Sequence, residues 1–429
     1  MLKSSPNHLF TWRPGRLAKG TLAMTVGMGL RTLGQSAVFL IVTRVLGVRE
    51  YGAYSAVIAL AMICGGFSMV GASLIMLRNV ACDARSFSDN WGRTLAAMLA
   101  TAPPLFGLYL LLVWMLLSGR GSWDNAVCFG IAEIISSPLI LATVHAYQGH
   151  ELMSSSARLI LVPIILKILA ALALVLIKII FNLDSLLTAW GALYMIASLV
   201  AVICNLRLVQ RDFGVPLKPV WKGLGASIKE GWMFSFGSSA QKVYADVDKI
   251  MLARLATLEA TGAYSAAYRI VDMSLVPMHA LYASLTARYF RMGQGAGGLA
   301  NGLQYGVTIL PYPLVYALGA GLGISFLSYF LTFFLGGGYS DAATALRYLA
   351  WLPLVTIWRD LLQKTLVGAG HQGATLAAFS IAACSNLTLN LWLIPLYNWF
   401  GAIISTYISE IIMACALSVF VYYKLHKAK

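Results

Sequence analysis

Long runs of apolar residues recur along this 429-residue chain and restrict its fold more than any other feature. Twelve of them approach or exceed the roughly 20 residues that a helix needs to cross a bilayer. Hydrophobic residues make up 59% of the chain and charged residues 11%, about half the charged share of a soluble domain. The longest gap between runs, Leu208 to Glu230, is too short for a separate folded domain. We therefore predict an all-α polytopic membrane protein with about 12 transmembrane helices.

The predicted spans form two sets of six, with edges uncertain by several residues. They cover residues 21–43, 52–77, 94–117, 125–145, 157–181, 185–207, 231–256, 262–287, 303–333, 342–368, 373–396 and 398–423.

A repeated segment relates the two sets of spans. RVLGVREYGAYSA (Arg44 to Ala56) recurs 210 residues later as RLATLEATGAYSA (Arg254 to Ala266), at the corresponding junction between spans. Because six crossings separate the copies, both halves enter the membrane in the same sense, as in a parallel repeat. We predict two six-helix lobes related by a pseudo-two-fold axis along the membrane normal. Residues 1–207 form the N-lobe, 208–230 a cytoplasmic linker and 231–429 the C-lobe.

The charge distribution sets the orientation. The formal net charge is +15, and an N-terminus inside the cell places most Lys and Arg residues in cytoplasmic segments. Both termini are therefore predicted to be cytoplasmic, with the basic N-terminus a retained tail. Without a polar domain to present a binding face, the positive charge does not indicate a nucleic-acid partner. The six cysteines are scattered singly, so neither a disulfide framework nor a metal site is predicted.

Ionisable residues within the spans are candidates for function because each is costly to insert. Arg31 lies midway along span 1, which offers it no carboxylate partner, and Gln35 follows one turn later. The 210-residue shift places Arg31 opposite Gln241, next to Lys242 of span 7. Arg269 lies about two turns into span 8. These cations are predicted to line a water-accessible cavity between the lobes.

Structural roles remain open for several charges. Arg269 with Asp272, and Lys242 with Asp246, are spaced as intrahelical ion pairs would be. Asp248 and Lys249 could instead lie near the outer interface, where a lysine extends its ammonium group to water. The sequence assigns no role to the remaining single-span charges, which are Glu133, Lys167, Arg359 and Glu410.

A mostly cationic cavity favours an anion, and guanidinium groups match phosphate oxygens. A diphosphate fits this chemistry. The sequence holds no Walker loop, so direct use of ATP is not predicted. An inside-negative potential of 100 mV favours the outward movement of two negative charges by about 4.6 kcal/mol.

Three motifs together resemble the Wzx-type oligosaccharide-lipid flippases of the multidrug/oligosaccharidyl-lipid/polysaccharide exporter (MOP) superfamily. They are VTRVLGVREYGAYSA, FFLGGGYSDAATALRYLA and NLTLNLWLIPLYNWFGAIISTYISE. The resemblance implies two six-helix lobes that work by alternating access in the bacterial inner membrane. It implies a cargo of undecaprenyl-diphosphate-linked oligosaccharide repeat units for O-antigen, capsule or exopolysaccharide assembly. Polysaccharide polymerase and chain-length machinery would be partners, membrane lipids would surround the chain, and no cofactor or enzymatic activity is expected.

On this interpretation, Arg31, Lys242 and Arg269 bind the diphosphate. Asp246, Asp272 and Gln35 tune those cations or bind a coupling ion, either a proton or sodium. Tyr244, Tyr268 and Tyr282 are candidates for stacking on sugars, with core packing as the alternative. The competing functions are a cation-coupled multidrug-type exporter, a membrane polysaccharide polymerase or ligase, and a non-catalytic assembly subunit.

Overall fold

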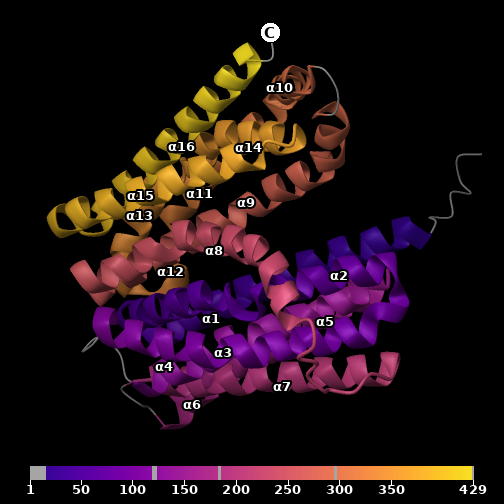
Figure 1. Ribbon diagram of the computed structural model, residues 1–429. Coiled ribbons are helices and arrows are strands. Elements are labelled where there is room, and N and C mark those ends of the chain that lie inside the picture. The colour runs from indigo at the N-terminus through magenta and orange to yellow at the C-terminus, as the bar shows by residue number, and fades with distance from the viewer. Residues whose placement is uncertain (1–15, 118–122, 182–184, 294–296, 428–429) are drawn as a thin grey trace, which may run out of the picture.

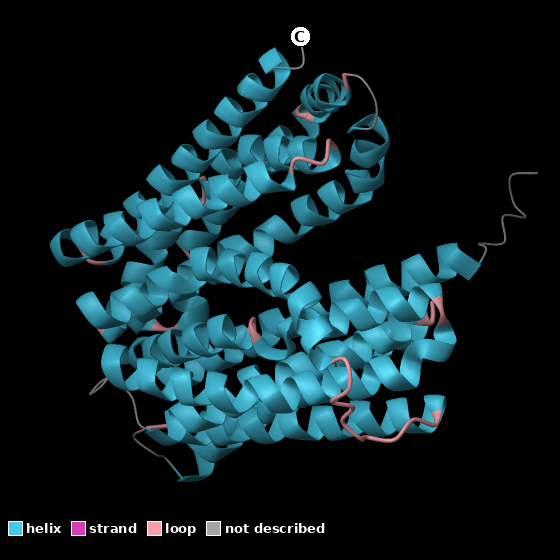
Figure 2. Ribbon diagram, viewed as in Figure 1, coloured by secondary structure: helices cyan, strands magenta, loops and turns pink. Residues whose placement is uncertain are grey.

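A computed structural model describes residues 16–117, 123–181, 185–293 and 297–427. Nearly all of this described part is helical, and it contains no strand (Figure 2). Residues 1–15 of the predicted cytoplasmic tail lie outside it.

The N-terminal half follows the predicted order of spans. α1 contains span 1 and the start of span 2, which continues through η1 and α2; spans 3, 5 and 6 are single helices, and span 4 is assembled from α4, η3 and α5. The bounds are α1 (Arg16–Gly65), η1 (Ser68–Gly71), α2 (Ala72–Cys82), η2 (Ala84–Ser86), α3 (Phe87–Leu117), α4 (Trp123–Gly130), η3 (Ile131–Ser136), α5 (Ser137–Gly149), α6 (Met153–Phe181) and α7 (Leu187–Phe213).

The C-terminal half also contains six successive spans. Spans 9 and 10 are broken, and each resumes with a proline in the first turn of the next helix, where the missing N–H costs little. The bounds are α8 (Leu224–Leu255), α9 (Leu258–Gly293), α10 (Gly298–Ile309), α11 (Pro311–Ser328), α12 (Leu331–Leu335), η4 (Gly337–Tyr339), α13 (Ser340–Leu349), α14 (Leu352–Gly368), α15 (Gln372–Tyr397) and α16 (Trp399–Lys427).

Helix length and composition alone find eight spans among the described residues. This smaller number has physical reasons. α1 is one long helix by its hydrogen bonds, yet Gly47, with φ 75°, divides it into two crossings. α8 and α9 carry many charges, and the tenth span is assembled from the shorter α13 and α14. The predicted all-α fold of about twelve spans is confirmed.

The helices form two lobes, α1–α7 and α8–α16, drawn from indigo to magenta and from pink to yellow in Figure 1. The lobes converge at the end that holds Gly47 and spread apart toward the start of α1 and the C-terminus (Figure 1). α8 contacts both lobes, because it packs on η1, α2 and α3 as well as on α15. Of the predicted 208–230 linker, only residues 214–223 lie between helices.

The sequence repeat forms one of the contacts between the lobes. A Cβ on Gly52 would lie 1.9 Å from the carbonyl oxygen of Leu258, and one on Gly262 would lie 1.9 Å from that of Val48. These contacts are reciprocal, since both pairs are related by the 210-residue shift. Only glycine permits so close an approach of two backbones. The pseudo-two-fold axis therefore passes between the two copies of the repeat.

Candidate functional site

A cavity of about 670 Å³ lies beside α1, α5, α6 and α8, in the half of the molecule nearest the start of α1. This is within the usual size range of ligand pockets, about 300–1,000 Å³. Arg31, Lys167 and Lys242 line the cavity, together with Gln35 and Glu133. Three cations thus face one carboxylate in the described lining, so the cavity carries a positive formal charge.

Small residues on α1 let the helical face that carries Arg31 pack against the protein. Gly27 and Gly34 lie on the helical face that Arg31 shares, at spacings of four and three residues. This face packs closely on α6, where a Cβ on Gly27 would lie 3.0 Å from the Cβ of Ala157. The opposite face exposes Leu33, at 68%. Arg31 therefore lies on the protein-facing side of α1.

Lys242 reaches the same cavity from the other lobe. Its Nζ lies 3.5 Å from the carbonyl oxygen of Met62, near the end of α1. The predicted alternative pair of Lys242 with Asp246 is not formed, because Asp246 pairs with Lys249 one turn further along α8. Arg31, Gln35 and Lys242, predicted separately from the sequence, thus line one space.

Arg269 on α9 lies outside the described lining of the cavity but close to it. It is near enough to act electrostatically on both Arg31 and Lys167. Asp272, also on α9, interacts electrostatically with Lys249 and Arg269. The two predicted tuning carboxylates, Asp246 and Asp272, are therefore grouped around Lys249, on the C-lobe side of the cationic cluster.

The three tyrosines predicted to stack on sugars pack against protein. Tyr244 makes an edge contact with Phe379, and Tyr268 lies against Tyr264 with ring centroids 5.6 Å apart. Tyr282 is only 3% exposed, and its hydroxyl donates to the carbonyl oxygen of Ile357 over 3.4 Å. None of the three belongs to the described lining of the cavity. We therefore leave them out of the proposed site.

The cavity also contains two residues to which the sequence assigned no role. The Lys167 Nζ donates to the hydroxyl of Tyr194 over 2.5 Å and lies 3.7 Å from a carboxylate oxygen of Glu133. The Tyr194 hydroxyl donates in turn to Glu133 over 2.6 Å. Sequence analysis missed this cluster because its members lie on three different spans, with no helical spacing to connect them.

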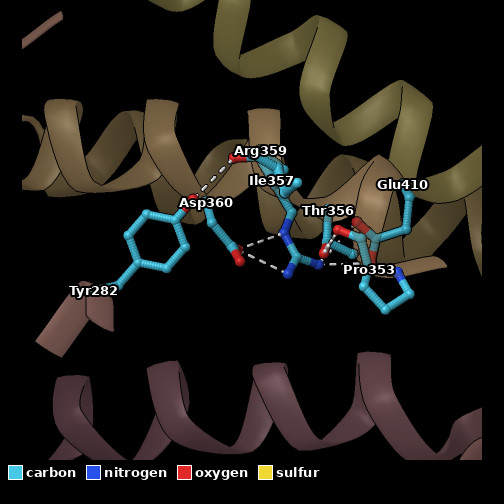
Figure 3. A network of polar contacts seen from close by, with 7 residues as sticks. All are labelled: Tyr282, Pro353, Thr356, Ile357, Arg359, Asp360 and Glu410. Carbon is cyan, nitrogen blue, oxygen red and sulfur yellow. Dashed lines mark hydrogen bonds and ion pairs between the residues drawn. The ribbon is translucent and has the colours of Figure 1, made fainter. Parts of the chain in front are cut away.

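Arg359 and Glu410 belong to a separate network in the C-lobe (Figure 3). Arg359 on α14 donates to Asp360 over 2.8 Å and to both carboxylate oxygens of Glu410 on α16, at 2.6 and 2.8 Å. All three side chains are at most 14% exposed. This network joins two helices of one lobe and lies outside the described lining of the cavity.

Asp248 is also buried, at 3% exposure, so its carboxylate is enclosed by protein. Its carboxylate accepts hydrogen bonds from Tyr264 at 2.6 Å and from Asn390 and Thr406 at 3.2 Å each. Across the described ranges, no group of three or more His, Cys, Asp or Glu residues could hold a metal ion.

Comparisons with solved structures identify the fold. The structure titled "Lipid II flippase MurJ, inward closed conformation" aligns with a TM-score of 0.72 at 13% identity, over 94% of this chain and 87% of that one. An inward-facing multidrug resistance MATE family transporter of the MOP superfamily aligns with a TM-score of 0.64 at 14% identity, over 95% and 98%. The MATE multidrug transporter DinF-BH aligns with a TM-score of 0.63 at 16% identity, over 98% of both chains.

These likenesses show a shared fold, the one that the predicted superfamily implies. A search of curated proteins finds no match. A family model described as "Polysaccharide biosynthesis protein" matches residues 17–286, which is more than half of the chain. That stretch includes all of the N-lobe helices, both copies of the repeat and the residues that line the cavity. The chain therefore belongs to the polysaccharide biosynthesis protein family.

Proposed function

We propose that this protein is a flippase for undecaprenyl-diphosphate-linked oligosaccharide repeat units. It would move them from the cytoplasmic to the outer leaflet for O-antigen, capsule or exopolysaccharide assembly. The observation that carries the proposal is the positively charged cavity in a member of the polysaccharide biosynthesis family. Arg31 and Lys242 reach this cavity from opposite lobes, and Arg269 acts on it electrostatically from α9.

The chemistry of the lining suits a diphosphate headgroup. Guanidinium and ammonium groups form strong charge-assisted hydrogen bonds with phosphate oxygens. The cavity is too small to enclose a sugar-diphosphate headgroup and a long polyprenyl chain together. The lipid tail would therefore remain in the bilayer, entering between the lobes.

The contacts between the lobes support alternating access. At one end the lobes are joined by Gly52 and Gly262, and the Arg44 side chain donates to the carbonyl oxygens of Phe333 and Phe334. The cavity is lined instead by the N-terminal part of α1, including Met28 and Arg31. The C-terminus lies where the lobes spread apart (Figure 1). From the basic segments, we propose that both termini are cytoplasmic. In that orientation the cavity takes up cargo from the cytoplasmic side of a bacterial inner membrane.

Replacing Arg31 tests the proposal. Arg31→Ala removes a phosphate-binding cation, and we expect it to abolish surface polysaccharide in a strain that depends on this chain while the protein stays inserted and abundant. Polysaccharide on intact cells and protein in membranes are measured together. Arg85→Ala, at an exposed site on η2, is the matched control and should leave the polymer unchanged. Normal polymer from Arg31→Ala would remove Arg31 from the site.

Two competing functions predict different results when the protein is lost. Loss of a flippase makes lipid-linked repeat units accumulate on the inner leaflet, whereas loss of a polymerase or ligase leaves them on the outer leaflet. A multidrug-type exporter, suggested by the likeness to MATE transporters, would change resistance to organic cations instead. The positive lining opposes that last alternative, since it repels cationic cargo.

A further inference from the structure

We propose that Lys167 is an additional binding residue for the anionic headgroup, and that Glu133 is the counter-ion which Lys167 exchanges for that headgroup. This inference rests on the proposed function. It gives the cluster of Glu133, Lys167 and Tyr194 a role in binding and release of cargo in addition to packing.

The first observation is the position of the cluster. Lys167 and Glu133 both line the cavity, and their side chains are 20% and 10% exposed. Lys167 lies within electrostatic range of Arg31 and Arg269, two of the cations assigned to the diphosphate. A headgroup held by those residues is therefore within the field of Lys167 as well.

The second observation is that Glu133 keeps its hydrogen bonds if Lys167 leaves it. One carboxylate oxygen accepts from Tyr194 at 2.6 Å, and the other accepts from Ser137 at 3.0 Å. Lys167 lies 3.7 Å from the carboxylate and reaches it mainly through the Tyr194 hydroxyl. Breaking this contact thus leaves both carboxylate oxygens hydrogen-bonded, which lowers the cost of separating the pair.

The third observation is the backbone that carries Glu133. Residues Ile131–Ser136 form a π-helical segment inside span 4, and such segments occur frequently at functional sites. Gly65 of α1 packs against this segment, since a Cβ there would lie 2.3 Å from the Glu133 carbonyl oxygen. The Ser68 hydroxyl donates to the carbonyl oxygen of Ile134 over 2.8 Å. These contacts hold the unusual segment in place and fix the direction of the Glu133 side chain.

Charge explains why an exchangeable counter-ion is useful. An empty cavity lined only by Arg31, Lys167 and Lys242 would place three uncompensated cations in a low-dielectric membrane protein, which is costly. Glu133 offsets one of them. When the diphosphate arrives, it offers Lys167 a stronger partner, and on release Glu133 takes the ammonium group back. The carboxylate therefore competes with cargo and limits its affinity.

The experiment measures binding of farnesyl diphosphate to the purified full-length protein, with farnesol as the uncharged comparison. Glu133→Gln removes the competing charge but keeps hydrogen-bonding capacity, and we expect binding about tenfold tighter, or ~1.4 kcal/mol. Lys167→Met should weaken binding about tenfold. Glu230→Gln is the matched control, because Glu230 pairs with Arg78 at an exposed site and should leave the affinity unchanged.

Each outcome decides the inference. If Glu133 and Lys167 serve packing alone, both variants will lower the melting temperature and leave farnesyl diphosphate affinity unchanged, which overturns it. Should Lys167→Met fail to fold, Glu133→Gln decides alone. If the wild-type protein binds farnesol as well as farnesyl diphosphate, the proposed function fails as well. If the wild type prefers the diphosphate and Arg31→Ala abolishes that preference while Glu133→Gln has no effect, only the inference fails.

Discussion

The two lobes share one helical plan but treat their intramembrane charges differently. In the N-lobe, Arg31 lines the cavity and forms no ion pair among the described contacts, while Lys167 is opposed by a single carboxylate. In the C-lobe, Arg359 is enclosed by two carboxylates and Lys249 pairs with Asp246. On the proposed function the N-lobe presents charge to a ligand, whereas the C-lobe neutralises much of its charge in ion pairs.

This difference follows from the cost of burial. A charge within a membrane protein must face water, a ligand or an opposite charge. Charges that are satisfied internally stabilise one arrangement of helices, and charges left facing a cavity are available for recognition. Two pairs of substitutions test this division, and a third substitution tests the contact between the lobes. They follow in order of decreasing expected effect.

Arg359→Met breaks the C-lobe network and leaves Asp360 and Glu410 buried without their cation. Because removing one partner of a buried ion pair leaves uncompensated charge, we expect the protein to lose about 3–5 kcal/mol of stability. The melting temperature of the purified protein measures this loss. Arg31→Ala removes the same charge from the cavity and should leave the melting temperature unchanged. Equal destabilisation by both variants would contradict the proposed division between the lobes.

Two lysines on α8 offer a comparison within one helix. Lys249→Met leaves Asp246 without its partner, and we expect a loss of about 2–3 kcal/mol because the pair is 15% exposed on each side. Lys242→Met, at the cavity, should reduce surface polysaccharide while preserving the melting temperature. The same two assays, applied to both variants, give opposite patterns if Lys242 serves binding and Lys249 serves structure.

At Gly52 the contact between the lobes depends on close packing of two backbones. Gly52→Ala places a methyl group against the backbone of α9, and we expect a cost of about 1–2 kcal/mol because the lobes can separate slightly to relieve it. Surface polysaccharide should fall as well, since the lobes would no longer close fully against each other at this end. Gly107→Ala is the control, because a Cβ there meets open space. Unchanged transport by Gly52→Ala would show that this contact is not needed.

Much of the fold could be predicted from the sequence because the insertion of each helix into the membrane depends on its local composition. Each of the predicted spans overlaps one helix or one set of consecutive helices, and spans 1 and 2 share α1. The repeat identified Gly52 and Gly262 as equivalent positions, although their direct contact emerged only from the structure. The breaks within spans 9 and 10 and the π segment of span 4 were not predicted, because they depend on packing between helices.

The candidate site was predictable only in part. Arg31 and Lys242 were found because they are cations deep within predicted spans, and the internal repeat related their depths. Glu133, Lys167 and Tyr194 could not be connected, since they come from separate helices at no fixed spacing. The tyrosines were candidates for sugar stacking by residue type, with core packing as the alternative, and the burial of Tyr282 agrees with packing.

The sequence by itself determined that the chain crosses a membrane, that its halves are parallel copies and that cations lie within its spans, because hydropathy, repetition and charge are local properties. Only the tertiary structure decided which cations meet. Pairing between helices depends on how they rotate and pack, which placed Arg359 beside Glu410 and left Lys242 facing the cavity.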